Sequence, residues 1–305
     1  MESANAGRLP LPAAQRSRRG SVVATMRPKQ WIKNALIIAA AGAAGALGHD
    51  DTLGRVAIAC VAFGLLASGI YAINDVRDAQ EDRLHPRKRF RPVAARELDP
   101  RFATGLGLSL VLAGIVLCAA VGPLLALVGA GYVALTLSYT LLWRHLIVFD
   151  IVAVAGGFVL RAVAGGVAAP VTLSSWFLVV VTGSAVFVAA AKRHAELRRT
   201  DGQRDRRRRV LNSYSASALE LIIAGASVVA LSAYWVWAFS LPLVHGIPWR
   251  PLTMVPFAVC LLRYGELVQR GDGEAPEDVL LSDRPLQFAG FAWLAMFALE
   301  VHAAG

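Results

Sequence analysis

Cysteine is scarce in this chain, with three residues in 305. Cys60, Cys118 and Cys260 each sit inside an apolar run, and no two of them have the close spacing of a metal-binding pair. The sequence therefore indicates neither a disulfide framework nor a zinc site. We expect the three side chains to pack as small apolar groups.

Charged residues are also few: Asp, Glu, Lys and Arg make up 17% of the chain, whereas 56% is hydrophobic and the mean hydropathy is +0.53. The net charge is nevertheless +10, so the charges must be segregated from the apolar mass. A hydrocarbon core of ~30 Å needs about 20 apolar residues per helix. The pattern predicts an all-α polytopic membrane protein with about nine transmembrane helices, at 30–48, 52–73, 102–121, 123–142, 146–168, 173–191, 215–240, 250–265 and 286–303.

Small residues recur within the apolar runs, as at Gly105, Gly107, Gly165 and Gly166. They allow close backbone approach between membrane helices. We therefore expect a single transmembrane domain at 27–305, preceded by a flexible basic cytoplasmic tail at 1–26. The tail does not resemble a cleaved signal peptide, because its basic region is long and no short apolar stretch ends in a small-residue cleavage site before Arg27.

The basic residues alternate between the two sides of the predicted membrane. Of the 31 lysines and arginines, all but Arg55, Arg161 and Arg250 fall in segments that face the cytoplasm if the N-terminus is inside. This bias follows the positive-inside rule and predicts a cytoplasmic N-terminus in the cell (inner) membrane. The basic run at 204–209 predicts contact with anionic lipid headgroups. Nucleic acid is not an expected partner, since no recognised binding module surrounds the run.

An acidic motif directly follows the second predicted span. Asp75, Asp78 and Asp82 stand at i, i+3 and i+7, so a helix would place them on one face. Three like charges on one face favour a hard divalent cation such as Mg²⁺, which takes oxygen ligands and shares them with substrate phosphates. We predict these aspartates as metal ligands and, with Asn74, as catalytic residues. The alternative is a solvated loop whose charges only fix orientation.

Basic residues that suit phosphate oxygens lie near this motif and at two other predicted cytoplasmic boundaries. The first group follows the aspartates, the second opens the first span, and the third follows the sixth span. In the third group Glu196 could orient a cation or hold a sugar hydroxyl. The candidate substrate-binding residues are Arg87, Lys88, Arg89 and Arg91; Lys29, Lys33 and Asn34; and Lys192, Arg193 and Glu196.

The fifth predicted span contains two charged residues, Asp150 and Arg161, which are eleven residues apart. This spacing is about three helical turns, so the two side chains share a face. Charged groups within a membrane pair with one another or line a cavity. We predict a polar stripe below the acidic motif, and a structural ion pair with another span is the alternative. Tyr139 and Arg144, in the turn before this span, would complete the rim of the site.

These motifs resemble a known family. Asn74-Asp75-x-x-Asp78-x-x-x-Asp82 resembles the first Asp-rich motif of the UbiA superfamily of intramembrane prenyltransferases, and the likeness extends over residues 26–303. Ordinary members carry a second motif, of DxxD type, after the sixth span. This chain has the segment KRHAEL at 192–197 in that place.

This departure, with the segments RPKQWIKN, FVLRAVAGG and PEDVLLSDR, resembles the decaprenyl-phosphate phosphoribosyltransferase branch of the family. The resemblance implies Mg²⁺-dependent transfer of 5-phosphoribosyl from 5-phosphoribosyl 1-diphosphate (PRPP) to a polyprenyl phosphate, for arabinan precursors of the cell envelope. PRPP carries a diphosphate and a separate phosphate, which suits one acidic face and one cationic anchor. We predict Lys192 and Arg193 at the sugar phosphate and Lys29 and Lys33 at the lipid phosphate.

Two other functions stay open at this point. A UbiA-type prenyltransferase would use a prenyl diphosphate donor, against which the missing second DxxD motif argues. A transporter would be expected to show corresponding broken spans in two repeats, and the sequence shows no convincing pair. The oligomeric state is also open, a homo-oligomer included.

Overall fold

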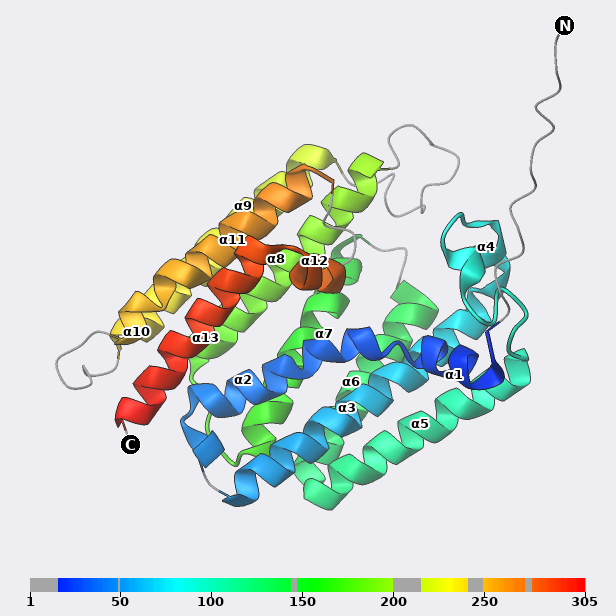
Figure 1. Ribbon diagram of the computed structural model, residues 1–305, viewed down its shortest axis with the longest axis horizontal. Helices are drawn as coiled ribbons and strands as arrows, with labels where there is room; N and C mark the ends of the chain where they lie inside the picture. The colour runs from blue at the N-terminus through cyan, green and yellow to red at the C-terminus, as the bar shows by residue number, and fades with distance from the viewer. Residues whose placement is uncertain are drawn as a thin grey trace, which may run out of the picture.

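The computed structural model describes residues 16–48, 50–143, 147–199, 215–240, 249–271 and 276–304, and the regular elements in these ranges are helices (Figure 1). Of the α-helices in these ranges, eight are long and five are short. The long helices are α3 (Asp50–Arg77), α5 (Pro100–Val121), α6 (Pro123–Ser138), α7 (Ile147–Ala168), α8 (Ser175–Arg199), α9 (Ala216–Phe239), α11 (Met254–Gln269) and α13 (Arg284–Ala304). The short helices are α1 (Arg18–Met26), α2 (Ala35–Ala43), α4 (Ala79–Leu84), α10 (Trp249–Leu252) and α12 (Pro276–Ser282).

Within the described residues, seven helical segments are long and apolar enough to cross a membrane. The protein is therefore a multi-pass helical membrane protein, as the sequence predicts. The seven segments coincide with the second to eighth predicted spans: Asp51–Arg77, Pro100–Val121, Pro123–Leu142, Phe149–Ala168, Ser175–Arg198, Ala216–Phe239 and Trp249–Gln269. The predicted count of nine is not confirmed.

The first predicted span, at 30–48, is not one continuous α-helix. Residues 28–34 form a 3₁₀ helix (Pro28–Asn34) that begins with proline, and only nine residues of α-helix, α2, follow it. At 1.5 Å per residue, α2 is about 14 Å long, roughly half of the hydrocarbon core. The last predicted span, at 286–303, lies within α13.

The segment before the first predicted span also differs from the expectation of a flexible tail at 1–26. Residues 18–26 form α1, which packs against α3 and buries Ser21 and Thr25. The hydroxyl of Ser17 caps the helix by accepting from the amide of Gly20, and Ser21 donates to Glu97 at 2.7 Å. These polar contacts and the packing on α3 hold residues 18–26 in place, although the composition alone predicts a solvated tail. Residues 1–15 lie outside the described residues.

Helix α3 lies at the centre of one half of the bundle, where it packs against α2, α5, α6 and α7. Phe63 and Leu66 are fully buried in this core. At the crossing with α5, a Cβ on Gly69 would lie 2.6 Å from the carbonyl oxygen of Gly107, and a Cβ on Gly107 would lie 2.9 Å from that of Gly69. The two glycines therefore set the separation of these helices.

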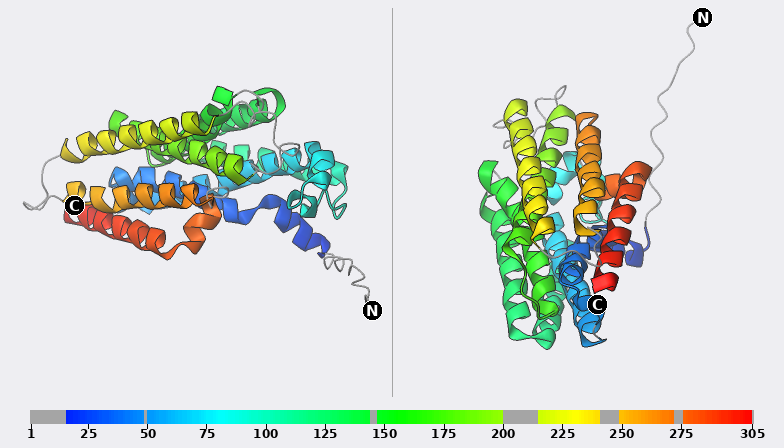
Figure 2. Two further views of the ribbon diagram at one scale, coloured as in Figure 1. Left: turned by 90° about the horizontal axis from the view of Figure 1, so that it is seen from above. Right: turned by 90° about the vertical axis from the view of Figure 1, so that its left-hand side faces the viewer.

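The other half of the bundle consists of α8, α9, α11 and α13, which run side by side (Figure 2). Phe187 and Tyr264 belong to its core. Helix α2 contacts both α7 and α13 and so joins the two halves. Helices α1 and α4 lie at one end of the bundle and α10 at the other (Figure 1). The acidic motif is therefore at the α1 and α4 end.

Candidate active site

The acidic motif spans the junction of α3 and α4. Asp78 interrupts the helix for one residue, with φ −89° and ψ 2°. The backbone nevertheless keeps its helical path, because Asp78 N donates to Asn74 O at 2.9 Å and Asp82 N donates to Asp78 O at 2.8 Å. As a result Asp75 and Asp82 both face Arg91, whose Nη1 lies 3.4 Å from Asp75 Oδ1 and 2.7 Å from Asp82 Oδ2.

A second arginine, Arg27, also neutralises Asp75. Its guanidinium donates to Asp75 Oδ1 and lies over the ring of Tyr71, 4.8 Å from the centroid. Arg27 ends α1 in a left-handed conformation, with φ 52°, which turns the chain toward α3. Arg27 was not among the predicted site residues, although it opens the RPKQWIKN segment. Its left-handed conformation and its partner 48 residues away are tertiary features.

The oxygens of this acidic group are only partly satisfied. Asn74 Oδ1 and Asp75 Oδ2 are buried and have no hydrogen-bond partner among the described residues. Buried polar atoms normally have a partner, so these two oxygens mark a place where a cation fits. The described residues contain no group of three His, Cys, Asp or Glu already arranged around one ion. In this structure Arg27 and Arg91 supply the positive charge instead.

Two other predicted basic residues of this loop, Arg87 and Arg89, are exposed. Arg89 lies over the ring of Phe90, 4.8 Å from its centroid. The backbone amides of Arg87 and Lys88 both donate to His85 Nδ1. Arg91, the fourth predicted residue, joins the acidic group through Asp75 and Asp82.

The predicted cationic segment on α8 divides into two environments. Arg193 holds both oxygens of Asp150 through Nε and Nη2, the latter at 2.7 Å, and donates from Nη1 to Glu196 at 2.6 Å. Tyr139 also donates to Asp150. Arg193 and Asp150 are both buried. This network ties α7 to α8, and the charge of Arg193 is already paired.

Lys192, one residue earlier, is different. Its side chain is half-buried and makes no hydrogen bond or ion pair with any residue in the described ranges. It lies close enough to Glu277 for its charge to act on that carboxylate. Lys192 is therefore the free cation of the predicted pair, and Arg193 is the residue that fixes α8 in place.

Arg161 and Asn34, predicted to face inward, meet in the bundle. Arg161 is 4% exposed and donates to Asn34 Oδ1 at 3.0 Å, Gly157 O at 2.8 Å and the hydroxyl of Tyr132 at 2.9 Å. All three partners are neutral. Arg161 and Asp150 therefore do not pair with each other. Asp150 makes the ion pair with another span that was the alternative interpretation, and its partner is Arg193 on α8. A buried guanidinium without a carboxylate partner favours an anion nearby.

Lys33 lies at the junction of the 3₁₀ helix and α2, where it meets Glu277 from α12. Lys33 Nζ is 3.7 Å from Glu277 Oε2, and Gln30 donates to Glu277 Oε1 while it accepts from Lys33. Burial raises the pKa of Glu277, but the positive charges of Lys33 and Lys192 and the hydrogen bond from Gln30 outweigh burial and hold the pKa below its ordinary value. Glu277 is therefore an anion.

Glu277 was not among the predicted site residues, and its signal in the sequence is only the acidic start of the PEDVLLSDR segment. Its neighbour Asp278 lies 4.0 Å from Lys29, and both of these side chains are largely exposed, at 65% and 77%. Lys29 is therefore at the rim rather than in the site. Arg144, predicted to complete the rim, lies outside the described residues, as does the basic run at 204–209.

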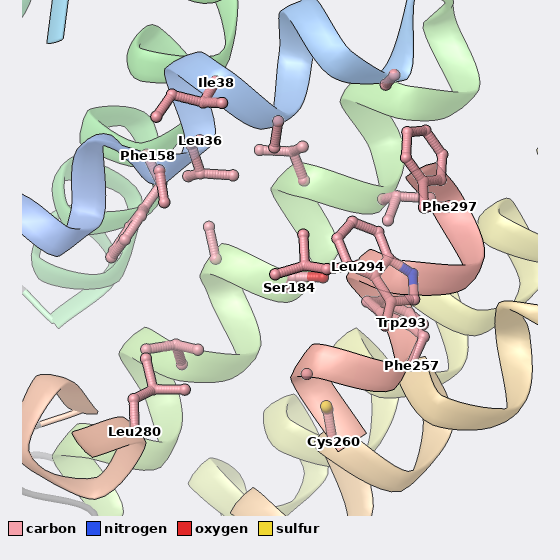
Figure 3. Close-up of a pocket in the computed structure, with 18 of the residues that line it drawn as sticks. Leu36, Ile38, Phe158, Ser184, Phe257, Cys260, Leu280, Trp293, Leu294 and Phe297 are labelled. Atoms are coloured by element: carbon pink, nitrogen blue, oxygen red, sulfur yellow. The ribbon is translucent and has the colours of Figure 1, made fainter. Parts of the chain in front are cut away.

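A cavity of about 1010 Å³ opens beside this polar cluster. It is lined by apolar side chains from α2, α7, α8, α9, α11, α12 and α13, among them Leu36, Phe158, Phe257, Trp293 and Phe297 (Figure 3). The charged residues in its lining are Lys33 and Glu277, and we call this pair the mouth of the cavity. A ligand with an apolar chain and an anionic end fits this arrangement, because most of the lining is apolar and the cation Lys33 lies at the mouth.

The fold and the site together define a polytopic helical membrane protein in which paired acids and cations lie beside an apolar cavity. The chain belongs to the UbiA prenyltransferase family, whose profile matches residues 35–295. The family predicted from the acidic motif is thus confirmed.

Curated relatives resemble the chain over most of its length. It is 41% identical to the decaprenyl-phosphate phosphoribosyltransferase of Corynebacterium glutamicum, with 92% of this chain and 86% of the relative covered. It is 38% identical to the protein of the same name from Mycolicibacterium smegmatis, with 92% of each chain covered. For the one from Mycobacterium tuberculosis the identity is 37%, with 92% of this chain and 94% of the relative covered.

Solved structures show the same fold. A UbiA homolog from Archaeoglobus fulgidus bound to GPP and Mg²⁺ has a TM-score of 0.71 at 16% identity, with 92% of this chain and 99% of that chain covered. The same homolog bound to DMAPP and Mg²⁺ has a TM-score of 0.70 at 15% identity, with the same shares covered. At these identities the likeness concerns the arrangement of helices.

Proposed function

We propose that this protein is a phosphoribosyltransferase, which moves the 5-phosphoribosyl group from PRPP to a polyprenyl (decaprenyl) phosphate and releases diphosphate. The relatives at 37–41% identity carry this activity in their names. The activity supplies a precursor for cell-wall arabinan, which is the role that the resemblance implies.

The observation that carries the proposal is the asymmetry of the site. One side presents the carboxylates of Asp75 and Asp82, and the other presents Lys33 and Lys192 around the single carboxylate of Glu277, in place of an aspartate pair. PRPP has the same asymmetry, since its C1 diphosphate needs a metal-bearing acidic face and its 5-phosphate needs cations alone. A prenyl diphosphate donor has no second phosphate group for the cationic side.

Asn74, Asp75, Asp78 and Asp82 would hold Mg²⁺, because they offer oxygen donors and two of these oxygens are buried without a partner among the described residues. When bound, the ion neutralises the leaving diphosphate and acts as a Lewis acid. Arg27, which pairs with Asp75, and Arg91, which pairs with Asp75 and Asp82, would release these carboxylates to hold the ion. The released guanidiniums then remain at hand for phosphate oxygens.

The acceptor lies with its isoprenoid chain in the apolar cavity and its phosphate at the mouth. An oxygen of that phosphate attacks C1 of the ribose, the bond from C1 to the diphosphate breaks, and the electron pair leaves with the diphosphate. No general base is needed, because the phosphate is already an anion near neutral pH. Lys33 and the cavity therefore contribute positioning, which supplies much of the rate enhancement when two substrates must meet in line.

The cationic side holds the sugar phosphate. Lys192 is the proposed anchor for the 5-phosphate, while Arg193 keeps α8 in place through Asp150. Arg161 adds a buried positive charge that favours the anionic substrates. The polar end of the bundle faces the cytoplasm in this proposal, with nine spans and a cytoplasmic N-terminus, because the basic loops cluster at that end.

The test is a transfer assay with purified protein in detergent. Labelled PRPP, Mg²⁺ and polyprenyl phosphate are incubated together, and the label is expected in the extracted lipid. A parallel reaction replaces PRPP with a labelled prenyl diphosphate and supplies an aromatic acceptor. Product only in the second reaction would overturn the proposal in favour of a prenyltransferase.

A further inference from the structure

Glu277 lies at the mouth of the cavity, where the proposed function places the phosphate of the acceptor. Its side chain is 11% exposed, and Gln30 and Lys33 both face its carboxylate. Oε1 accepts from Gln30, while Oε2 lies 3.7 Å from Lys33 Nζ and has no hydrogen-bond partner among the described residues. The carboxylate is thus held on one side by an amide and a lysine, and the other side is unsatisfied.

The same lysine is the cation in the lining of the cavity. A lipid whose chain fills that cavity must leave its polar end at the mouth, where Lys33 is the available counter-ion and Glu277 already occupies it. A phosphate and a carboxylate there would be two anions beside one lysine. Two anions that share one lysine away from bulk water repel each other strongly. The phosphate and the carboxylate therefore cannot both stay beside Lys33.

We propose that Glu277 is an internal stand-in for the acceptor phosphate. In the free protein its carboxylate occupies Lys33 and Gln30, and the phosphate of a polyprenyl phosphate displaces it and takes over these donors. This inference rests on the proposed function and adds to it the site of the acceptor headgroup, formed by Lys33 and Gln30 with Lys192 near by. It also assigns Glu277 as the residue that sets acceptor specificity.

The exchange explains how two lysines are kept together before the substrate arrives. Lys33 and Lys192 both interact with Glu277 and repel each other, so the carboxylate offsets their mutual repulsion, with Glu196 as a second anion beside Lys192. An incoming phosphate replaces one anion by another and keeps the charge balanced. An uncharged polyprenol brings no anion and cannot displace Glu277. Glu277 thereby discriminates between the phosphate and the alcohol through a penalty on the wrong ligand.

The experiment measures lipid binding in the absence of PRPP. Farnesyl phosphate, a soluble short-chain probe, is titrated into the full-length protein in neutral detergent at fixed salt, and farnesol is titrated in parallel. Glu277→Gln is expected to bind farnesyl phosphate about tenfold more tightly than the wild type, a change of ~1.4 kcal/mol. The amide keeps the shape of the side chain but removes the competing charge. Farnesol binding is expected to gain less than farnesyl phosphate binding.

Asp278→Asn is the matched control, because it makes the same charge change on the same helix at a side chain that is 65% exposed. It is expected to leave the affinity for farnesyl phosphate unchanged. Glu277→Asp serves as a second variant in case the glutamine variant fails to fold: its carboxylate reaches Lys33 less well, so the affinity should rise by a smaller factor. Elution as a single peak in size-exclusion chromatography establishes that each variant is folded.

Weaker binding of farnesyl phosphate by both Glu277 variants would overturn the proposal, since it would mean that the carboxylate holds the ligand directly. An equal gain in Glu277→Gln and Asp278→Asn would also overturn it, because general electrostatics would then suffice. The binding experiment uses no PRPP. If the probe binds as expected but PRPP is not a donor, the proposed function fails while the acceptor site stands.

Discussion

The guanidinium of Arg27 donates a hydrogen bond to Asp75, so the residue that follows α1 neutralises an acid in the last turn of α3. Asp75 is 1% exposed and would otherwise carry a buried charge. A buried carboxylate without a counter-ion costs several kcal/mol. In this structure Arg27 and Arg91 therefore supply the counter-charge of the acidic face.

The first prediction concerns the acidic face. Asp75→Asn is expected to lower turnover at least about a hundredfold, because it removes a ligand charge that acts on the leaving diphosphate, and two such factors of ten correspond to ~2.8 kcal/mol. The measurement is label transfer from PRPP to lipid at saturating Mg²⁺. Glu81→Gln, an exposed acid on α4, is the control and should stay close to wild type. Full activity of Asp75→Asn, or of protein stripped with EDTA, would contradict the assignment.

The second prediction concerns the arginine that bridges the acids. Arg91→Gln is expected to bind Mg²⁺ more tightly in the absence of PRPP, by about tenfold, because the ion no longer has to displace a charge-assisted hydrogen bond of ~1.5–3 kcal/mol. Isothermal titration with MgCl₂ gives the affinity directly. Arg89→Gln, whose side chain lies over Phe90, makes the same charge change without that contact. The competition between arginine and metal is refuted if both variants behave alike.

The third prediction distinguishes the roles of Lys192 and Arg193, two adjacent cations that look equivalent in the sequence. Arg193→Gln should destabilise the bundle by about 3–5 kcal/mol, because it leaves Asp150 buried without its partner. Lys192→Gln should leave the melting temperature in detergent unchanged and weaken PRPP binding by about 1.5–3 kcal/mol. Thermal unfolding and a PRPP titration of both variants test this. A stable Arg193→Gln protein that fails only in PRPP binding would show that Arg193 contacts the substrate.

The fourth prediction concerns the start of α13. Hydrogen bonds from Arg263, at 2.8 Å and 3.2 Å, hold the pKa of Asp283 below its ordinary value of 3.8, and burial opposes this. A carboxyl whose pKa is lower in the folded state stabilises the fold above its unfolded pKa, and this contribution disappears as the pH falls through the folded pKa. Wild type should therefore be more stable than Asp283→Asn at neutral pH, and the difference should shrink below about pH 4. Unfolding temperatures of the two proteins between pH 3 and pH 7, about the range over which a carboxyl titrates, provide the measurement. A difference that does not vary with pH would contradict this account.

The sequence alone determines the features that depend on local pattern. The length of each apolar run identifies the seven spans from 51 to 269, because a membrane helix must be long and apolar whatever it packs against. The spacing of Asp75 and Asp82 places them on one side of the chain, and the structure keeps them there even though Asp78 interrupts the helix. The family follows from that same motif.

The tertiary structure decides which charges are paired and which are free. Lys192 and Arg193 are adjacent and look equivalent in sequence, yet Arg193 points to Asp150 on α7 and Lys192 does not. Gln30 and Glu277 meet across 247 residues. Partners this far apart in the chain are set by how the helices pack, and the packing depends on contacts such as that of Gly69 with Gly107. Local sequence specifies where the long apolar helices lie, whereas the free energy of a buried charge depends on its neighbours in space.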